Sequence, residues 1–217
     1  MVIASAPTRW MYADYFTWRG IQVREVASAL AALDHLSAFS PDAAVIEERL
    51  GDWTGLDLVR ALRRCRATAV LPVALLSTDV FGLDESKAKA CGCDVLLVLP
   101  CLPETLLRSL VDLVQMRAAD PRPAPTDSSL FVNRDDSVMM LRTSDHVLRI
   151  SGPGKRRRAF TFQNELDRAT FQVRYEQRLA NAGYVLEAFR TDRRAAAADR
   201  RQSRRGADRR LEQAQEK

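Results

Sequence analysis

The chain has 217 residues, of which 47% are hydrophobic and 28% are charged, a balance that excludes a disordered polymer, a collagen-like fibre and a bundle of membrane helices. The net charge of +5 is uneven, because residues 1–118 carry 12 basic and 14 acidic side chains, residues 119–191 carry 12 and 9, and residues 192–217 carry 9 and 5. An anionic partner is therefore expected only in the C-terminal half. Four cysteines, no signal peptide and no apolar run near the ~20 residues of a membrane span predict a cytoplasmic protein without a membrane crossing.

Short aliphatic runs alternate with segments of helical periodicity over residues 1–117. The runs predict five strands, at residues 1–4, 21–26, 43–46, 70–76 and 95–98. The intervening segments predict five helices, at residues 10–18, 27–39, 56–66, 85–91 and 104–117. Each strand must return through a crossover helix, so the order predicts an α/β fold, a doubly wound parallel (βα)5 sheet with helices on both faces. Ligands of such sheets bind beyond the carboxyl ends of the strands.

Three stretches carry recognisable motifs: PDAAVIE followed by WTGLDLVRALR within residues 41–63, LPVALLST at residues 71–78, and KACGCDVLLVLPCLPETL at residues 89–106. Through them, residues 1–117 resemble the receiver domain of two-component response regulators, which is flavodoxin-like with the strand order 2-1-3-4-5. In that family an aspartate ends the third strand, a Thr or Ser ends the fourth, and a Lys before Pro ends the fifth. Glu47, Ser77 and Leu99 occupy these positions at the family's separations.

The resemblance implies which chemistry is missing. In a working receiver the aspartate takes a phosphoryl group from a histidine kinase, Mg²⁺ binds that aspartate and an acidic pair after the first strand, and the Lys and the hydroxyl neutralise phosphoryl oxygens. Here the first strand ends in Ala4 and Ser5 without a carboxylate, and Leu99 replaces the lysine. Pro100 is kept, and the resemblance implies a cis bond before it. We therefore predict no metal, no cofactor and no phosphotransfer, with the Ser77 hydroxyl the one group retained.

Three interpretations of Glu47 are open. Its additional methylene displaces the carboxylate by about an ångström, and a misplacement of that size can cost ~100-fold in rate, so a receiver that still uses Glu47 is the enzymatic rival. A fixed negative charge could instead imitate the phosphorylated state, or Glu47 is left over in a site that does no chemistry. We favour the last interpretation, because Leu96 stands where the family's switch aromatic lies. Arg49 is a candidate ion-pair partner for Glu47.

The remaining cysteine, histidine and glycine patterns predict no further site. Cys91 and Cys93 are one residue apart, which differs from the usual metal-binding spacing and favours core packing. Neither His35 nor His146 stands in a nucleophile arrangement. The Gly152-Pro153-Gly154 segment fits a hairpin turn and not a phosphate loop, and no helix-turn-helix pattern is present.

A Pro-rich linker is predicted at residues 118–129, which read AADPRPAPTDSS. Beyond it, residues 130–190 predict a small α+β domain of three antiparallel strands, a helix and a fourth strand, at residues 137–142, 147–150, 158–162, 164–182 and 184–189. Asn164 caps the predicted helix and Gly183 ends it. A unit of about 60 residues is small for an independent core, so we expect it to pack on the first domain or on a second copy.

Two groups of basic residues are candidate anion sites: Lys155, Arg156, Arg157 and Arg158 in the predicted hairpin, and Arg200, Arg201, Arg204 and Arg205 among the repeated Arg pairs of residues 191–217. A basic hairpin is more often a solvated turn. The tail, residues 191–217, has almost no apolar anchor and is predicted to be disordered or a marginal helix. Nucleic acid, anionic lipid and acidic protein stay open as its partners, beside a purely solubilising role.

The sequence therefore predicts a bacterial signal-transduction protein of the phosphorelay type, whose degenerate receiver binds other signalling proteins and is not an enzyme. By fold analogy alone, residues 85–117 are the expected partner surface, and a homodimer through it is open. The alternative, which we do not favour, is a nucleic-acid-associated regulator that binds through the basic hairpin and the Arg-rich tail. Its affinity for nucleic acid would fall steeply with salt.

Overall fold

The computed structural model describes residues 1–36, 38–51, 53–79, 85–119, 127–134, 136–152 and 157–190. The predicted tail, Lys155, Arg156 and most of the predicted linker lie outside these residues. The described residues form two units, the first from Met1–Pro125 and Gln163–Tyr175, and the second from Thr126–Phe162 and Glu176–Lys217. No helix in the described ranges has the length and apolar character that a membrane span requires.

A parallel sheet lies at the centre of the first unit. It contains β1 (Ala44–Glu47), β2 (Val73–Ser77) and β3 (Val95–Val98), paired in the order β1-β2-β3. Val2 forms parallel bridges to both Val26 and Ile46, so the first two predicted strands extend the sheet beyond β1. The order 2-1-3-4-5 is confirmed, but the predicted strands at residues 1–4 and 21–26 are reduced to isolated bridges.

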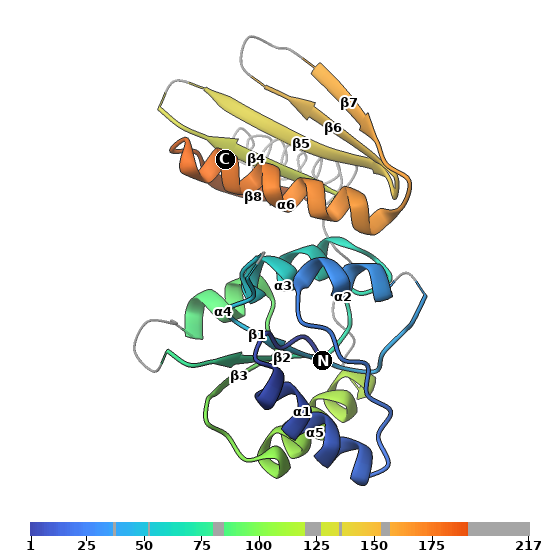
Figure 1. The fold of residues 1–217 in the computed structure, drawn as a ribbon. Coiled ribbons are helices and arrows are strands. Elements are labelled where there is room, and N and C mark those ends of the chain that lie inside the picture. The colour runs from blue at the N-terminus through green and yellow to red at the C-terminus, as the bar shows by residue number, and fades with distance from the viewer. Residues whose placement is uncertain are drawn as a thin grey trace, which may run out of the picture. The chain divides into compact units, whose positions relative to one another are not determined.

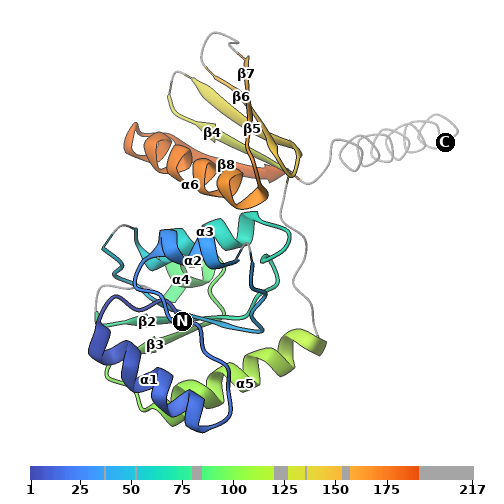
Figure 2. The same ribbon diagram turned by 45° about the vertical axis from the view of Figure 1, so that its right-hand side comes forward.

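Helices cover both faces of this sheet (Figure 1). They are α1 (Ala6–Trp18), α2 (Ala29–Leu36), α3 (Gly55–Arg64), α4 (Glu85–Cys91) and α5 (Pro103–Ala119). Both views place α1 and α5 on one face and α2 and α3 on the other (Figures 1 and 2). All five residues of β2 are buried, which explains why the sequence there is continuously apolar rather than alternating.

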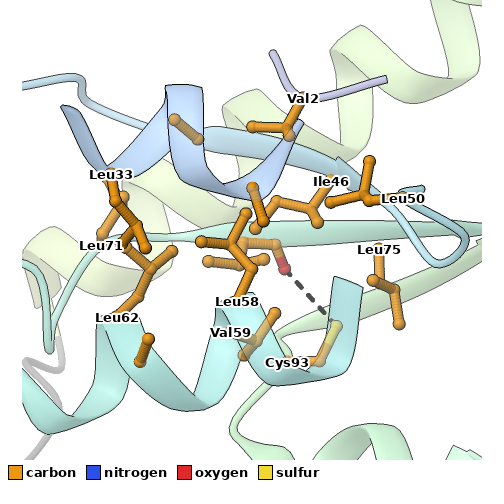
Figure 3. Packing of buried hydrophobic residues seen from close by; sticks show 14 of the residues in the cluster. Val2, Leu33, Ile46, Leu50, Leu58, Val59, Leu62, Leu71, Leu75 and Cys93 are labelled. Atoms are coloured by element: carbon orange, nitrogen blue, oxygen red, sulfur yellow. Dashed lines mark hydrogen bonds between the residues drawn. The ribbon is translucent and has the colours of Figure 1, made fainter. Parts of the chain in front are cut away.

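Two hydrophobic clusters fill the space between the sheet and its helices. One joins α2 and α3 to the sheet through Leu33, Leu58 and Leu62, as Figure 3 shows. The other joins α1 and α5 to the opposite face, through Tyr12, Phe16, Leu106 and Leu110 among others. This two-sided burial is what the alternating strand and helix pattern predicts.

A buried carboxylate links the two helical layers. The Asp94 side chain, only 1% exposed, accepts hydrogen bonds from the backbone N–H of Val73 at 2.8 Å and from Arg63 Nη2 at 3.0 Å, and it also pairs with Arg117. Arg63 comes from α3 and Arg117 from α5, which lie on opposite faces of the sheet. Asp94 therefore ties both layers to β2.

Replacing Asp94 with alanine is expected to lower the free energy of unfolding by about 3–5 kcal/mol, because the Val73 N–H loses its buried acceptor and two partly buried guanidinium groups lose their counter-charge. Urea unfolding of the full chain measures this loss. Glu104→Ala is the matched control, since its pair with Arg108 is solvent-exposed and such pairs contribute about 1 kcal/mol or less. Equal losses for both variants would contradict the assignment of Asp94 as the link.

The first half of α6 (Glu165–Asn181) belongs to the first unit. Val173 joins the cluster formed with α2 and α3, and the buried Arg168 donates from Nη2 to the carbonyl oxygen of Arg64 at 2.7 Å. Glu165 accepts hydrogen bonds from the Cys65 thiol at 3.0 Å and from the Arg66 N–H at 2.8 Å. Burial acts to raise the pKa of Glu165, but these hydrogen bonds and the charge of Arg168 outweigh it, so its pKa lies below the usual value.

Glu165→Gln is expected to be less stable than the native chain at neutral pH. A pKa that is lowered in the folded state stabilises the fold above the unfolded-state pKa of about 4.3. That stabilisation disappears as the pH falls through the lower, folded-state value. Urea unfolding at neutral pH and at about pH 3 should therefore show the difference between the two proteins shrinking in acid, and a difference independent of pH would contradict this prediction. Glu104→Gln serves as the exposed control.

The second unit contains a five-stranded antiparallel sheet. Its strands are β4 (Ser128–Val132), β5 (Ser137–Ser144), β6 (Val147–Ser151), β7 (Arg157–Thr161) and β8 (Val185–Arg190), in the order β7-β6-β5-β4-β8. The α+β arrangement agrees with the sequence prediction, but β4 was not predicted and occupies part of the expected linker. Gly183 follows α6 with φ of 81°, as its predicted role in ending the helix requires.

Candidate functional site

The three family positions meet at the carboxyl edge of the parallel sheet. Glu47 ends β1, Ser77 ends β2, and Leu99 follows β3 directly. The backbone N–H of Leu99 donates to the carbonyl oxygen of Ser77 at 2.7 Å, and the Leu99–Pro100 peptide bond is cis, as the resemblance implies. The predicted spacing therefore brings these residues to one edge.

Glu47 is held by the backbone of the first strand. Its Oε2 accepts a hydrogen bond from the Ala4 N–H at 2.7 Å. Beside it, the Ser5 hydroxyl forms a hydrogen bond with Thr8 at 2.9 Å between the two side-chain oxygens. A backbone N–H thus contacts Glu47 from the segment that supplies carboxylates in the receiver family. Within the described ranges no ion pair joins Glu47 to Arg49, the partner that the sequence suggested.

Glu48, which sequence reasoning did not single out, is the partner of the retained hydroxyl. The Ser77 hydroxyl donates to Glu48 Oε2 and accepts from the Asp79 N–H at 3.0 Å. Ser77 is only 1% exposed, so its hydroxyl is engaged inside the protein on both its donor and acceptor sides. Glu47 ends β1 and Glu48 follows it directly, and the sequence carries no signal for which of the two turns toward Ser77.

Apolar packing surrounds Leu99, which stands at the position of the lysine in the receiver family. Leu99 is half-buried and packs against the cluster between the sheet and the helices α1 and α5. Arg9, also missed by sequence reasoning, is the cation near the end of the first strand. It donates from Nη1 to the carbonyl oxygens of Ile3 at 2.5 Å and Ala4 at 3.3 Å, and its Nε lies 3.7 Å from a Glu25 oxygen.

The loop after Leu99 is attached to α1 by a buried phenol. The Tyr12 hydroxyl donates to the carbonyl oxygen of Cys101 at 2.8 Å. Burial, followed by interaction with the Cys101 thiol, raises the pKa of Tyr12. Tyr12 therefore stays protonated and keeps donating this hydrogen bond at physiological pH.

Other predicted residues lie apart from this edge. Cys91 and Cys93 are buried free thiols, and burial raises the pKa of Cys93 to about 11, which agrees with core packing. Arg157 and Arg158 are exposed at the start of β7 in the second unit. Arg200, Arg201, Arg204 and Arg205 lie outside the described residues. Across the described ranges no three His, Cys, Asp or Glu side chains gather in a way that could hold a metal ion.

The geometry at the edge depends on a close approach between β1 and α3. The Gly55 N–H donates to the carbonyl oxygen of Glu48 at 2.6 Å, and a Cβ on Gly55 would lie 2.3 Å from the carbonyl oxygen of Glu47. The Thr54 side chain caps α3 by accepting from the Asp57 N–H. The WTGLD motif, residues 53–57, therefore starts α3 in contact with the backbone of Glu47 and Glu48.

No family model and no curated protein matches this sequence. Solved structures do match its first part. The signal receiver domain of a signal transduction histidine kinase from Syntrophus aciditrophicus is 23% identical with a TM-score of 0.50, over 53% of this chain and 87% of that one. A sensor protein from Polaromonas sp. JS666 is 22% identical with a TM-score of 0.50, over 53% and 93%. The chemotaxis response regulator CheY4 of Vibrio cholerae is 27% identical with a TM-score of 0.49, over 52% and 93%.

These matches confirm the predicted resemblance in fold for about half of the chain. Residues of the first unit have the flavodoxin-like fold of receiver domains, and the antiparallel sheet is separate from it. At identities below 25% the likeness concerns the fold, and function has to be argued from the site itself.

Gly55→Ala is expected to lower the free energy of unfolding by about 1–3 kcal/mol, because the new methyl group meets backbone atoms that cannot rotate away. Gly51→Ala is the matched control, since a Cβ there meets nothing within 4 Å, and surface changes of this kind usually stay within about 0.5 kcal/mol. Urea unfolding compares the two variants. Similar midpoints for both would contradict the close approach.

Proposed function

We propose that this protein transmits a signal of the two-component type in the bacterial cytoplasm by binding other proteins, through a receiver-like unit that does not undergo phosphotransfer. One observation carries the proposal. Both polar side chains that the family would use at the carboxyl edge are engaged within the chain: Glu47 by the Ala4 N–H and Ser77 by Glu48.

Phosphoryl transfer to a carboxylate needs groups that the described side chains of this edge do not supply. The transfer depends almost entirely on positioning and on cations that neutralise the phosphoryl oxygens. Here Leu99 packs among apolar side chains, and Arg9 is turned toward backbone carbonyl oxygens. Among the described residues, an incoming phosphoryl group would therefore meet two glutamates with no ammonium group and no metal-binding cluster beside them.

The same contacts favour a leftover Glu47 over one that imitates phosphorylation. Imitation requires Glu47 to draw in Ser77 and, through it, a switch residue on the last strand of the sheet. Ser77 instead pairs with Glu48, and Leu96, at the switch position, packs against the cluster formed with α2 and α3. The Ser77 hydroxyl therefore does not link Glu47 to β3.

Exposed apolar side chains support residues 85–117 as the binding surface. Leu102 is 71% exposed and Met116 is 65% exposed, and Val98 and Val111 are also exposed. All four side chains lie in the segment that the fold analogy gives as the partner surface, and exposed apolar groups contribute to contacts with other proteins when they form a patch. A homodimer and a second signalling protein remain alternative occupants of this surface. The domain boundaries at residues 117, 129 and 190 and the anion-binding role of the basic residues also remain predictions.

Incubating the full chain with acetyl phosphate and Mg²⁺ is expected to leave its intact mass unchanged. The triple variant Ala4→Asp, Glu47→Asp and Leu99→Lys is the comparison protein, because its new side chains restore part of the missing chemistry. A stoichiometric phosphoryl adduct on the native chain, absent from Glu47→Gln, would overturn the proposal. Beryllofluoride titration with Mg²⁺, followed by tryptophan fluorescence, provides an independent readout.

A further inference from the structure

The antiparallel sheet of the second unit has one buried face and one open face. Phe131, Val138, Met140, Leu148 and Ile150 are buried and alternate along β4, β5 and β6. The intervening residues point to the other face and are half-buried or exposed. This open face borders a hollow of about 930 Å³.

Apolar and cationic side chains are segregated across the open face. The strand register aligns Leu130, Met139, Ser151 and Arg157 in one row across β4, β5, β6 and β7. The neighbouring row is Ser128, Leu141, Arg149 and Ala159. The first row has Leu130 and Met139 over β4 and β5 and Arg157 over β7, and the second has Leu141 over β5 and Arg149 over β6. Over these four strands the large apolar side chains therefore lie on β4 and β5 and the arginines on β6 and β7.

The arginines of this face are available to a ligand. Arg149 and Arg157 are exposed, and neither forms an ion pair with any residue that the structure describes. Asp136 is the one acidic residue among the described lining of the hollow. The face therefore offers unpaired positive charge beside an apolar surface.

We propose that the open face binds an amphipathic helix of a partner protein, with an apolar stripe over Leu130, Met139 and Leu141 and acidic residues along the flank that faces Arg149 and Arg157. The distance from β4 to β7 is three strand spacings, about 14 Å, and a helix with its side chains is about 10–12 Å wide. A single helix thus covers both halves. This interaction is independent of phosphotransfer in the first unit.

Two other occupants fit the face less well. Single-stranded nucleic acid is bound by stacking on aromatic side chains, and the described lining contains none, because Phe131 and Phe160 lie in the other set of alternating positions. A second copy stacked on this face would set its arginines against arginines or against Leu and Met. In both arrangements Asp136 is the one acidic residue among the described lining, which is too few to pair the arginines of two copies.

The test selects binders of the full chain from a displayed library of 18-residue amphipathic helices, in which the apolar stripe is fixed and both flanks vary among Glu, Gln and Lys. We expect enrichment of Glu on one flank. The double variant Arg149→Glu and Arg157→Glu should instead enrich Lys. In fluorescence anisotropy a selected Glu peptide should bind at least tenfold more weakly to that variant and to Met139→Lys, with no change for Arg178→Glu, an exposed arginine of α6 that does not line the hollow.

Circular dichroism of each variant separates lost binding from lost folding. No charge bias among the selected peptides, or a bias that survives the double variant, would overturn the proposal. The proposal is also wrong if a single-stranded oligonucleotide displaces the peptide and itself loses binding in the same variants. That result would assign the face to nucleic acid. A dimer that forms in native chain and dissociates in Met139→Lys would assign it to a second copy.

Discussion

The close approach of α3 to the end of β1 determines the geometry of the carboxyl edge. Gly55 lies so near the carbonyl oxygen of Glu47 that a Cβ would stand only 2.3 Å from it, and its N–H binds the next carbonyl group. The chain must therefore turn from strand to helix within a few residues, which leaves Glu47 and Glu48 at the edge. Glu47 then meets the Ala4 N–H and Glu48 meets Ser77. The close approach therefore fixes the backbone from which both glutamates contact their hydrogen-bond donors.

Hydrogen bonds position the two consecutive glutamates at the carboxyl edge. Glu47 accepts a hydrogen bond from a backbone N–H, and Glu48 accepts one from a hydroxyl, so each side chain is fixed by a different donor. Leu99 contributes packing where a lysine would contribute charge. Among the residues that the structure describes, the edge is therefore held together by hydrogen bonds and apolar packing.

The sequence predicted those features that follow from periodicity and spacing. The parallel sheet was predicted because β2 and its neighbours form apolar runs that alternate with helical segments. The strand order and the site positions Glu47, Ser77 and Leu99 were predicted from the resemblance to receiver domains. Strand β4 was missed because its five residues, SSLFV, begin with two serines inside a Pro-rich stretch. The pairing of Ser77 with Glu48 depends on side-chain direction at the end of a strand, which spacing does not determine.

The sequence also gave no indication that α6 packs in the first unit. The first part of α6, to Tyr175, belongs to the first unit although four of the five strands of the antiparallel sheet precede it in the chain. No local pattern reveals a contact between Cys65 and Glu165 at a separation of 100 residues.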